Sequence, residues 1–404
     1  MATIAVVGTL DSKGYEHQFV AEQIQAQGHK ALLIDVGTLT PPQIEPNISR
    51  DQVLAYSNIN LPEREDRGER VTAMSEALPA CLATLAEKGE IEGVISLGGG
   101  GGTAIATAGM RALPIGFPKV MVSTLASGNT AHYVSTKDIV MFPSIVDVAG
   151  LNDISKKLFA RAAGAICGMV TTPLPEASDK PLIVASMFGN TTECIDHARE
   201  LLTKKGYEVL VFHATGTGGR TMEALIESGL VQGVLDVTTT EWADELTGAT
   251  LSAGPTRLEA AGKANVPAIV SPGCLDMANF GEPHTVPSNL KDRTFYHHNP
   301  QVTLMRTNSK ECTELGRILA EKVNAYTAPV TVLLPTKAIS VISAEGQDFY
   351  DPGADQALFQ AIRDNLDNRI ELIEVDTTIN DPVFSEACAN ALLANLKKFN
   401  KGSK

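Results

Sequence analysis

One pattern of strand, loop, helix, glycine and strand occurs twice in the sequence, in residues 3–37 and again in residues 181–213. Each copy starts with a short apolar run rich in β-branched residues, which is typical of a buried parallel strand. Each helix is followed by a glycine, Gly28 or Gly206, the residue that most often ends a helix. This repetition favours an α/β fold built from βαβ units.

The similarity between the two halves continues past these units. Segment 91–100 resembles 231–240, a strand after a short glycine turn in both cases. Segment 117–129 resembles 266–281, a strand that follows a proline and ends in a loop of small residues. Matches in the same order indicate a duplication, or at least two doubly wound sheets in tandem. We therefore predict an α/β protein with two tandem Rossmann-like domains, each doubly wound and mainly parallel.

The boundary between the domains is expected in 171–181, which is polar and contains three prolines. With 404 residues, the chain is longer than one hydrophobic core usually supports. The sequence thus predicts a nucleotide-binding domain at 1–175 and a second domain with a substrate site at 176–404. Residues 41–70 are polar and proline-rich, and we expect them to form an excursion or lid beside the second strand.

The most informative motif is a run of five glycines and a threonine between a strand and a helix of small residues. Without Cβ atoms, backbone N–H groups can approach an anion closely, and the helix N-terminus adds a partial positive charge. The run therefore predicts a cradle for the phosphates of a nucleotide; the alternative is a tight junction without a ligand. It lacks the lysine of a P-loop. The predicted cradle is Gly98, Gly99, Gly100, Gly101, Gly102 and Thr103.

Two further strand ends in the first half should face the same crevice, because the carboxyl ends of parallel strands share one edge. Lys13 has the charge to neutralise a phosphate, and Asp11 suits Mg²⁺ or a ribose hydroxyl. A solvated turn in which Asp11 caps the helix is an equally good interpretation. The additional nucleotide-binding candidates are Thr9, Leu10, Asp11, Lys13, Ser123, Thr124, Ser127 and Gly128.

Reactive side chains follow the strands of the second half. Histidines and carboxylates of this kind perform general acid–base chemistry or bind a divalent metal. If they converge at one sheet edge, the catalytic candidates are His213, Glu241, Asp276, His297 and His298. Taken singly, each is more often a structural residue. The candidates for binding an anionic substrate are Gly218, Gly219, Arg220 and Arg306.

Charge and hydropathy exclude two classes of partner. The net charge is −14, which argues against non-specific binding to nucleic acid. We find no uninterrupted apolar run of about 18 residues, so no transmembrane helix is expected. The N-terminus reads as a first strand and not as a signal peptide, which predicts a cytoplasmic protein.

Long motifs along the whole chain resemble one family. They include GTLDSKG, SLGGGGGTA, FHATGTGGRTMEALI, DVTTTEWADELTG, VSPGCLDMANFG and HHNPQVTLMRT. The sequence resembles an uncharacterised bacterial, fungal and plant family that includes the N-terminal inhibitory domain of the tomato mosaic virus resistance protein. This resemblance implies two Rossmann-like subdomains, a homodimer, and ATP bound in the N-terminal subdomain at 9–13, 98–103 and 123–129.

Three functions fit the sequence. The first is an enzyme that binds ATP, with Mg²⁺, and acts on a small anionic metabolite. The second is a nucleotide-responsive binding or regulatory protein without catalysis. The third is an ATP-independent lyase or hydrolase with its site in the second half.

Overall fold

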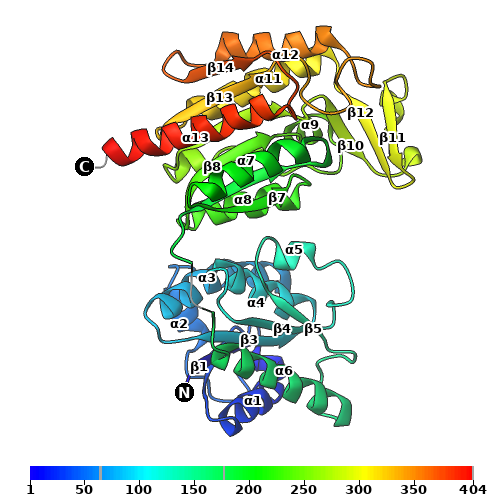
Figure 1. Ribbon diagram of the computed structural model, residues 1–404. Helices are drawn as coiled ribbons and strands as arrows, with labels where there is room; N and C mark the ends of the chain where they lie inside the picture. The colour runs from blue at the N-terminus through cyan, green and yellow to red at the C-terminus, as the bar shows by residue number, and fades with distance from the viewer. Residues whose placement is uncertain (63–65, 176–177, 403–404) are drawn as a thin grey trace. The chain divides into compact units, whose positions relative to one another are not determined.

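The computed structural model describes residues 1–62, 66–175 and 178–402, and it divides the chain into two compact units, Met1–Glu176 and Ala177–Lys404 (Figure 1). In the first unit, five strands pair in parallel in the order β2-β1-β3-β4-β5. These strands are β1 (Thr3–Gly8), β2 (Lys30–Asp35), β3 (Gly93–Gly98), β4 (Lys119–Ser123) and β5 (Val140–Pro143).

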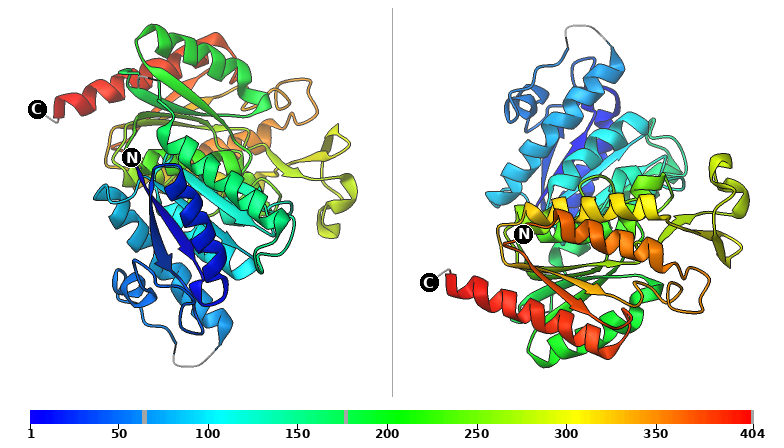
Figure 2. Two further views of the ribbon diagram at one scale, coloured as in Figure 1. Left: turned by 90° about the horizontal axis from the view of Figure 1, so that it is seen from below. Right: turned by 90° about the horizontal axis from the view of Figure 1, so that it is seen from above.

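Helices cover both faces of this sheet because its central strands are apolar on both sides. Helices α1 and α6 share one apolar core with the sheet, and α2, α3 and α4 share the other. In Figure 2, α1 and α6 run side by side over one face. The helices are α1 (Leu10–Ala26), α2 (Arg50–Ala55), α3 (Arg67–Glu87), α4 (Gly100–Ala112), α5 (Ala131–Val134) and α6 (Asp153–Thr171).

The second unit contains a six-stranded parallel sheet in the order β14-β13-β9-β8-β6-β7. Its first four strands in the chain pair as those of the first unit do, so the predicted pair of doubly wound sheets is confirmed. The strands are β6 (Leu182–Met187), β7 (Glu208–His213), β8 (Val231–Thr238), β9 (Ala268–Gly273), β13 (Val330–Pro335) and β14 (Glu371–Val375).

The helices of the second unit also form two layers (Figure 2). Helices α7 and α13 pack on one face, and α8 to α12 contribute to the core on the other. They are α7 (Thr192–Lys204), α8 (Thr217–Glu227), α9 (Glu241–Thr247), α10 (Ala260–Lys263), α11 (Ser309–Asn324), α12 (Pro352–Asn365) and α13 (Pro382–Gly402). Short 3-10 turns complete the unit at Gly189–Thr191, Pro283–Thr285 and Ser288–Leu290.

After β9 this unit adds a small antiparallel sheet, which was not predicted from the sequence. It has the order β10-β12-β11, and its strands are β10 (Met277–Phe280), β11 (Phe295–Asn299) and β12 (Val302–Arg306). The segment carrying His297 and His298 therefore forms a strand of this sheet and is not at an end of the parallel sheet.

The glycines that end the first helix of each repeat have similar backbone conformations, which explains why the repeat can be recognised in the sequence. Gly28 and Gly206 have φ angles of +82° and +93°, in the left-handed region that side chains with a Cβ rarely adopt. Each follows the last turn of its helix and directs the chain into the next strand, β2 or β7. The two halves thus keep the same local geometry at the same step of the fold.

Candidate functional site

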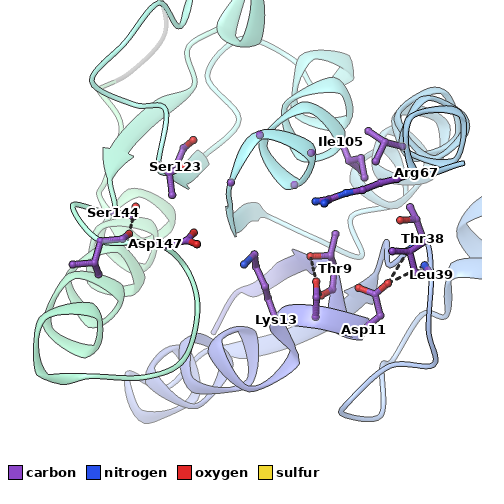
Figure 3. A pocket seen from close by; sticks show the side chains of 18 of the residues that line it. Thr9, Asp11, Lys13, Thr38, Leu39, Arg67, Ile105, Ser123, Ser144 and Asp147 are labelled. Atoms are coloured by element: carbon purple, nitrogen blue, oxygen red, sulfur yellow. Dashed lines mark hydrogen bonds between the residues drawn. The ribbon is translucent and has the colours of Figure 1, made fainter.

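A cavity of about 960 Å³ lies at the carboxyl edge of the first unit's sheet (Figure 3). Loops after β1, β2, β3, β4 and β5 contribute to it, which agrees with the rule that ligands bind beyond the carboxyl ends of parallel strands. Its lining comprises Thr9, Asp11, Ser12, Lys13, Thr38, Leu39, Thr40, Arg67, Val71, Gly99, Gly100, Gly101, Gly102, Ile105, Ser123, Thr124, Ser127, Pro143, Ser144, Ile145, Val146 and Asp147.

The glycine run forms the start of α4 and presents its backbone to this cavity. Gly99 is the N-cap, and its carbonyl accepts the N–H of Thr103 at 2.8 Å. Among the described residues, the N–H groups of Gly100, Gly101 and Gly102 meet no acceptor. An open helix N-terminus of this kind attracts an anion through these three N–H groups and through the helix dipole.

Two cationic side chains reach the same cavity. The ammonium of Lys13 donates to the carbonyl of Val148, and Figure 3 shows it pointing toward the glycine turn. Arg67, the first residue of α3, is exposed, and the described residues provide no hydrogen bond or ion pair to its guanidinium. A Cβ placed on Gly101 would lie 4.0 Å from Nη2 of Arg67, so this guanidinium lies beside the glycine turn.

Asp11 has a structural partner in the cavity wall. Its Oδ2 accepts the backbone N–H groups of Thr38 and Leu39, both at 3.0 Å. The carboxylate thereby holds the loop after β2 against the start of α1. Asp11 lies in the first turn of α1, whose N-cap is Thr9, so it does not cap the helix as one of the two sequence interpretations expected.

Four of the predicted nucleotide-binding residues lie outside the cavity lining. The side chain of Leu10 is buried in the core, and Gly98 is the last residue of β3. The Thr103 hydroxyl is fully buried and bonds the Ser123 hydroxyl at 2.7 Å, so it ties α4 to β4. The N–H of Gly128 donates to the carbonyl of Leu125 within its own loop.

In the second unit, Glu241 is fully buried and belongs to a network around Arg257. Its Oε2 accepts Nε of Arg257 at 2.6 Å. The same guanidinium makes two parallel bonds to Asp236, at 2.6 and 2.7 Å, and lies 3.3 Å from Glu223. One buried cation therefore holds three carboxylates, and the exposed fraction of its side chain is only 1%.

The other carboxylate oxygen of Glu241, Oε1, lies at the N-terminus of α8. Oε1 accepts the N–H groups of Gly216 and Gly219 at 2.7 and 3.1 Å. A Cβ on Gly219 would meet Oε2 at 2.2 Å, and a Cβ on Gly218 would meet the carbonyl of His213 at 1.8 Å. These glycines are therefore needed for close packing, and the protein's own carboxylate occupies the position that an anionic ligand would take.

The remaining predicted catalytic residues do not join Glu241 in one cluster. Asp276 is buried and accepts the Ser340 hydroxyl at 2.8 Å. His297 lines a separate hollow with Lys291 and Phe295. His213 is close enough to Glu241 for their charges to interact, but the two make no hydrogen bond, and the His213 ring contacts that of Phe188 at an angle of 47°. The side chain of His298 lies outside the described residues. Within the described part of the chain, no group of three or more histidine, cysteine and acidic side chains has a metal-binding arrangement.

The predicted substrate-binding arginines are also engaged. Arg306 is buried, pairs with Asp355 at 2.6 Å, and donates through Nε to the carbonyl of Phe349 at 2.9 Å. Arg220 is exposed and donates to the carbonyl of Ser252 at 3.1 Å. Arg306 is thus a structural residue, and only Arg220 keeps access to solvent.

Burial around Arg257 produces a pH-dependent contribution to stability. Desolvation raises the pKa of Glu223 to about 7 from its ordinary 4.5, although Arg257 opposes the shift. Between these values the folded unit binds more protons than the unfolded chain, so its stability falls as the pH rises through this window. Asp244, also buried, has a pKa raised to about 7 and acts in the same direction.

We expect Glu223→Gln to reduce this pH dependence. The amide oxygen of glutamine can still accept the N–H of Leu258, but glutamine does not titrate. The slope of the free energy of unfolding against pH should therefore become smaller by about 1 kcal/mol per pH unit near neutrality. Urea denaturation followed by the fluorescence of Trp242, the one tryptophan and a residue of this unit, measures it. Equal slopes for the variant and the wild type would contradict the assignment.

No helix among the described residues has both the length and the apolar character needed to cross a membrane.

Comparison with known proteins assigns the chain to a family. Two family models match, the N-terminal domain of the uncharacterised protein family UPF0261 over residues 2–175 and its C-terminal domain over residues 180–396. A crystal structure of MurG from Acinetobacter baumannii aligns with 99% of this chain and 100% of the MurG chain, at 12% identity and a TM-score of only 0.23.

Sequence relatives give the same assignment. A UPF0261 protein of Clostridium tetani is 45% identical over 400 residues, which are 98% of this chain and 99% of that protein. The ToMV resistance protein Tm-1 of tomato, Solanum lycopersicum, is 41% identical over 335 residues, which are 81% of this chain and 44% of the tomato protein. The chain belongs to the UPF0261 family, whose members occur in bacteria and plants.

Proposed function

We propose that the chain binds ATP in the cavity of its first unit and uses it in a reaction on a small anionic metabolite. The observation that carries this proposal is the open N-terminus of α4, where three unbonded N–H groups face the cavity. Lys13 and Arg67 in the same cavity add positive charge. The choice of ATP among phosphate compounds follows from the family resemblance noted in the sequence.

The lining supports one orientation of the nucleotide. The phosphates fit the turn Gly99–Gly102 and the ammonium of Lys13. Leu39 and Ile105 lie on the Arg67 side of the cavity in Figure 3, and a Cβ on Gly101 would contact both Val71 and Arg67. These apolar side chains suit a base, and a guanidinium stacks well on a base. The cavity is thus polar where phosphates would lie and apolar where the base would lie.

The contrast between the two units supports nucleotide binding in the first unit alone. In the second unit the carboxylate of Glu241 accepts the N–H groups at the start of α8. An added phosphate there would meet a buried negative charge, which opposes binding. Within the described part of the first unit, no carboxylate accepts the N–H groups of Gly100–Gly102.

A second function is nucleotide binding that regulates another protein, without catalysis. The specific observation in its favour is the separation of the predicted catalytic residues, since Glu241 and Asp276 belong to different buried networks. Calorimetric titration of ATP into the protein tests binding, and release of ADP in the presence of sugar acids and other small acids tests turnover. Binding without turnover would favour the regulatory function.

Replacing Lys13 by methionine should weaken ATP binding by about 10- to 100-fold, because one charge-assisted hydrogen bond to a phosphate is lost. The matched control is Lys137→Met, since Lys137 also donates to a backbone carbonyl, that of Leu113 at 3.2 Å, and does not line the cavity. Calorimetry on both variants measures the difference. Equal affinities for the two variants would count against the assigned phosphate position.

A further inference from the structure

The cavity is lined by a second carboxylate, that of Asp147, which makes no side-chain bond that would explain its position. It follows β5, and the described residues offer it neither a hydrogen bond nor an ion pair. Figure 3 shows it between Lys13 and Ser123, on the side of the cavity opposite Asp11. Thr124 and Ser127, both exposed, also line the cavity, and a Cβ placed on Gly99 would lie 3.7 Å from Oγ1 of Thr124.

The backbone on both sides of Asp147 is fixed. The N–H of Ser144 donates to the carbonyl of Ser123 at 3.1 Å, and the Ser144 hydroxyl donates to the carbonyl of Val146 at 2.6 Å. On the other side, the ammonium of Lys13 donates to the carbonyl of Val148. The loop that carries Asp147 is therefore anchored on both sides, and its exposed carboxylate lies at the wall of the cavity on the same side as Lys13.

A lone carboxylate beside a phosphate site creates an electrostatic conflict. The N–H groups of Gly100–Gly102 attract negative charge, while Asp147 repels a phosphate bound near Lys13. A divalent cation between the two anions removes this repulsion. Mg²⁺ commonly binds in this way, through one or two carboxylates, phosphate oxygens and several waters.

We propose that Asp147 is the protein ligand of a Mg²⁺ ion that binds together with the terminal phosphates of the nucleotide. This inference rests on the proposed function and assigns the metal to Asp147 instead of Asp11. The reason is that Oδ2 of Asp11 already accepts two backbone N–H groups, whereas both oxygens of Asp147 are available.

The test is calorimetric titration of ATP into the full chain, once with Mg²⁺ and once with EDTA. For the wild type, Mg²⁺ should raise the affinity by about tenfold or more. For Asp147→Asn this gain should disappear, while the affinity in EDTA stays equal or rises because one repelling charge is removed. Far-UV circular dichroism confirms that the variant is folded.

Asp11→Asn is the matched control, because its amide oxygen can still accept the N–H groups of Thr38 and Leu39. It should keep the full gain from Mg²⁺. An undiminished gain in Asp147→Asn, or loss of the gain in Asp11→Asn alone, would overturn the assignment while leaving ATP binding intact. If the wild type binds no ATP in either condition, the proposed function fails and the metal site fails with it.

Discussion

Replacing Arg257 by methionine is expected to lower the free energy of unfolding of the second unit by about 3–5 kcal/mol, because three carboxylates lose the cation that compensates them. Arg257 bonds Asp236 twice and Glu241 once, all within 2.7 Å, and its side chain is only 1% exposed. Water cannot replace the lost bonds in this interior. Trp242 donates to the carbonyl of Arg257 at 3.2 Å, so its fluorescence reports unfolding at this place.

The matched control is Arg363→Met. Arg363 also makes two bonds to one carboxylate, that of Glu374, at 2.7 and 3.0 Å, but its side chain is 28% exposed. Solvent screens such a pair, and its loss should cost about 0–1 kcal/mol. A similar cost for both variants would show that the Arg257 network contributes no more than a surface ion pair.

Two further measurements separate charge from lost packing. Protonation of the uncompensated carboxylates removes buried charge, so the stability that Arg257→Met loses relative to the wild type should become smaller as the pH falls from about pH 8 to about pH 5. The double variant Arg257→Met with Asp236→Asn should be more stable than the single variant, because it buries one carboxylate fewer. If neither change restores stability, the loss comes from packing alone.

The Arg257 network could not be predicted from the sequence. Glu241 follows a strand of the second half, and the sequence indicated it as a candidate acid or base. Its partner Arg257 comes 16 residues later, in a loop with no periodic pattern. Only the tertiary fold brings the two together, so a buried structural carboxylate and a reactive one look alike in sequence.

The fold and the glycine cradle were more readily predicted because both follow local rules. Apolar runs identify the central strands, and parallel strands place their carboxyl ends at one edge, which brings Thr9, Lys13 and Gly99–Gly102 together. Arg67 was missed because it follows a long proline-rich connection and was included in the excursion expected at 41–70, whereas it is the first residue of α3. Ile145 and Asp147 were missed because β5 has only four residues, too few to distinguish a strand from an apolar loop, so its carboxyl end was not recognised as part of the sheet edge.

Gly100→Val is expected to weaken ATP binding by about 100-fold or more, with little change in the stability of the first unit. A Cβ on Gly100 meets no atom within 4 Å, so the protein has room for the new side chain. Valine is also a better helix former than glycine. The added methyl groups lie at the open start of α4, where they keep phosphate oxygens away from N–H groups that must approach within about 3 Å.

Gly168→Val in α6 is the matched control. Gly168 is also a helical glycine of the first unit, a Cβ on it also meets no atom within 4 Å, and it does not line the cavity. Calorimetry should therefore give wild-type affinity for Gly168→Val and the large loss for Gly100→Val, with unchanged circular dichroism for both. Retained affinity in a folded Gly100→Val protein would mean that the phosphates do not bind at the glycine turn, since a branched side chain there and a phosphate cannot occupy the same space.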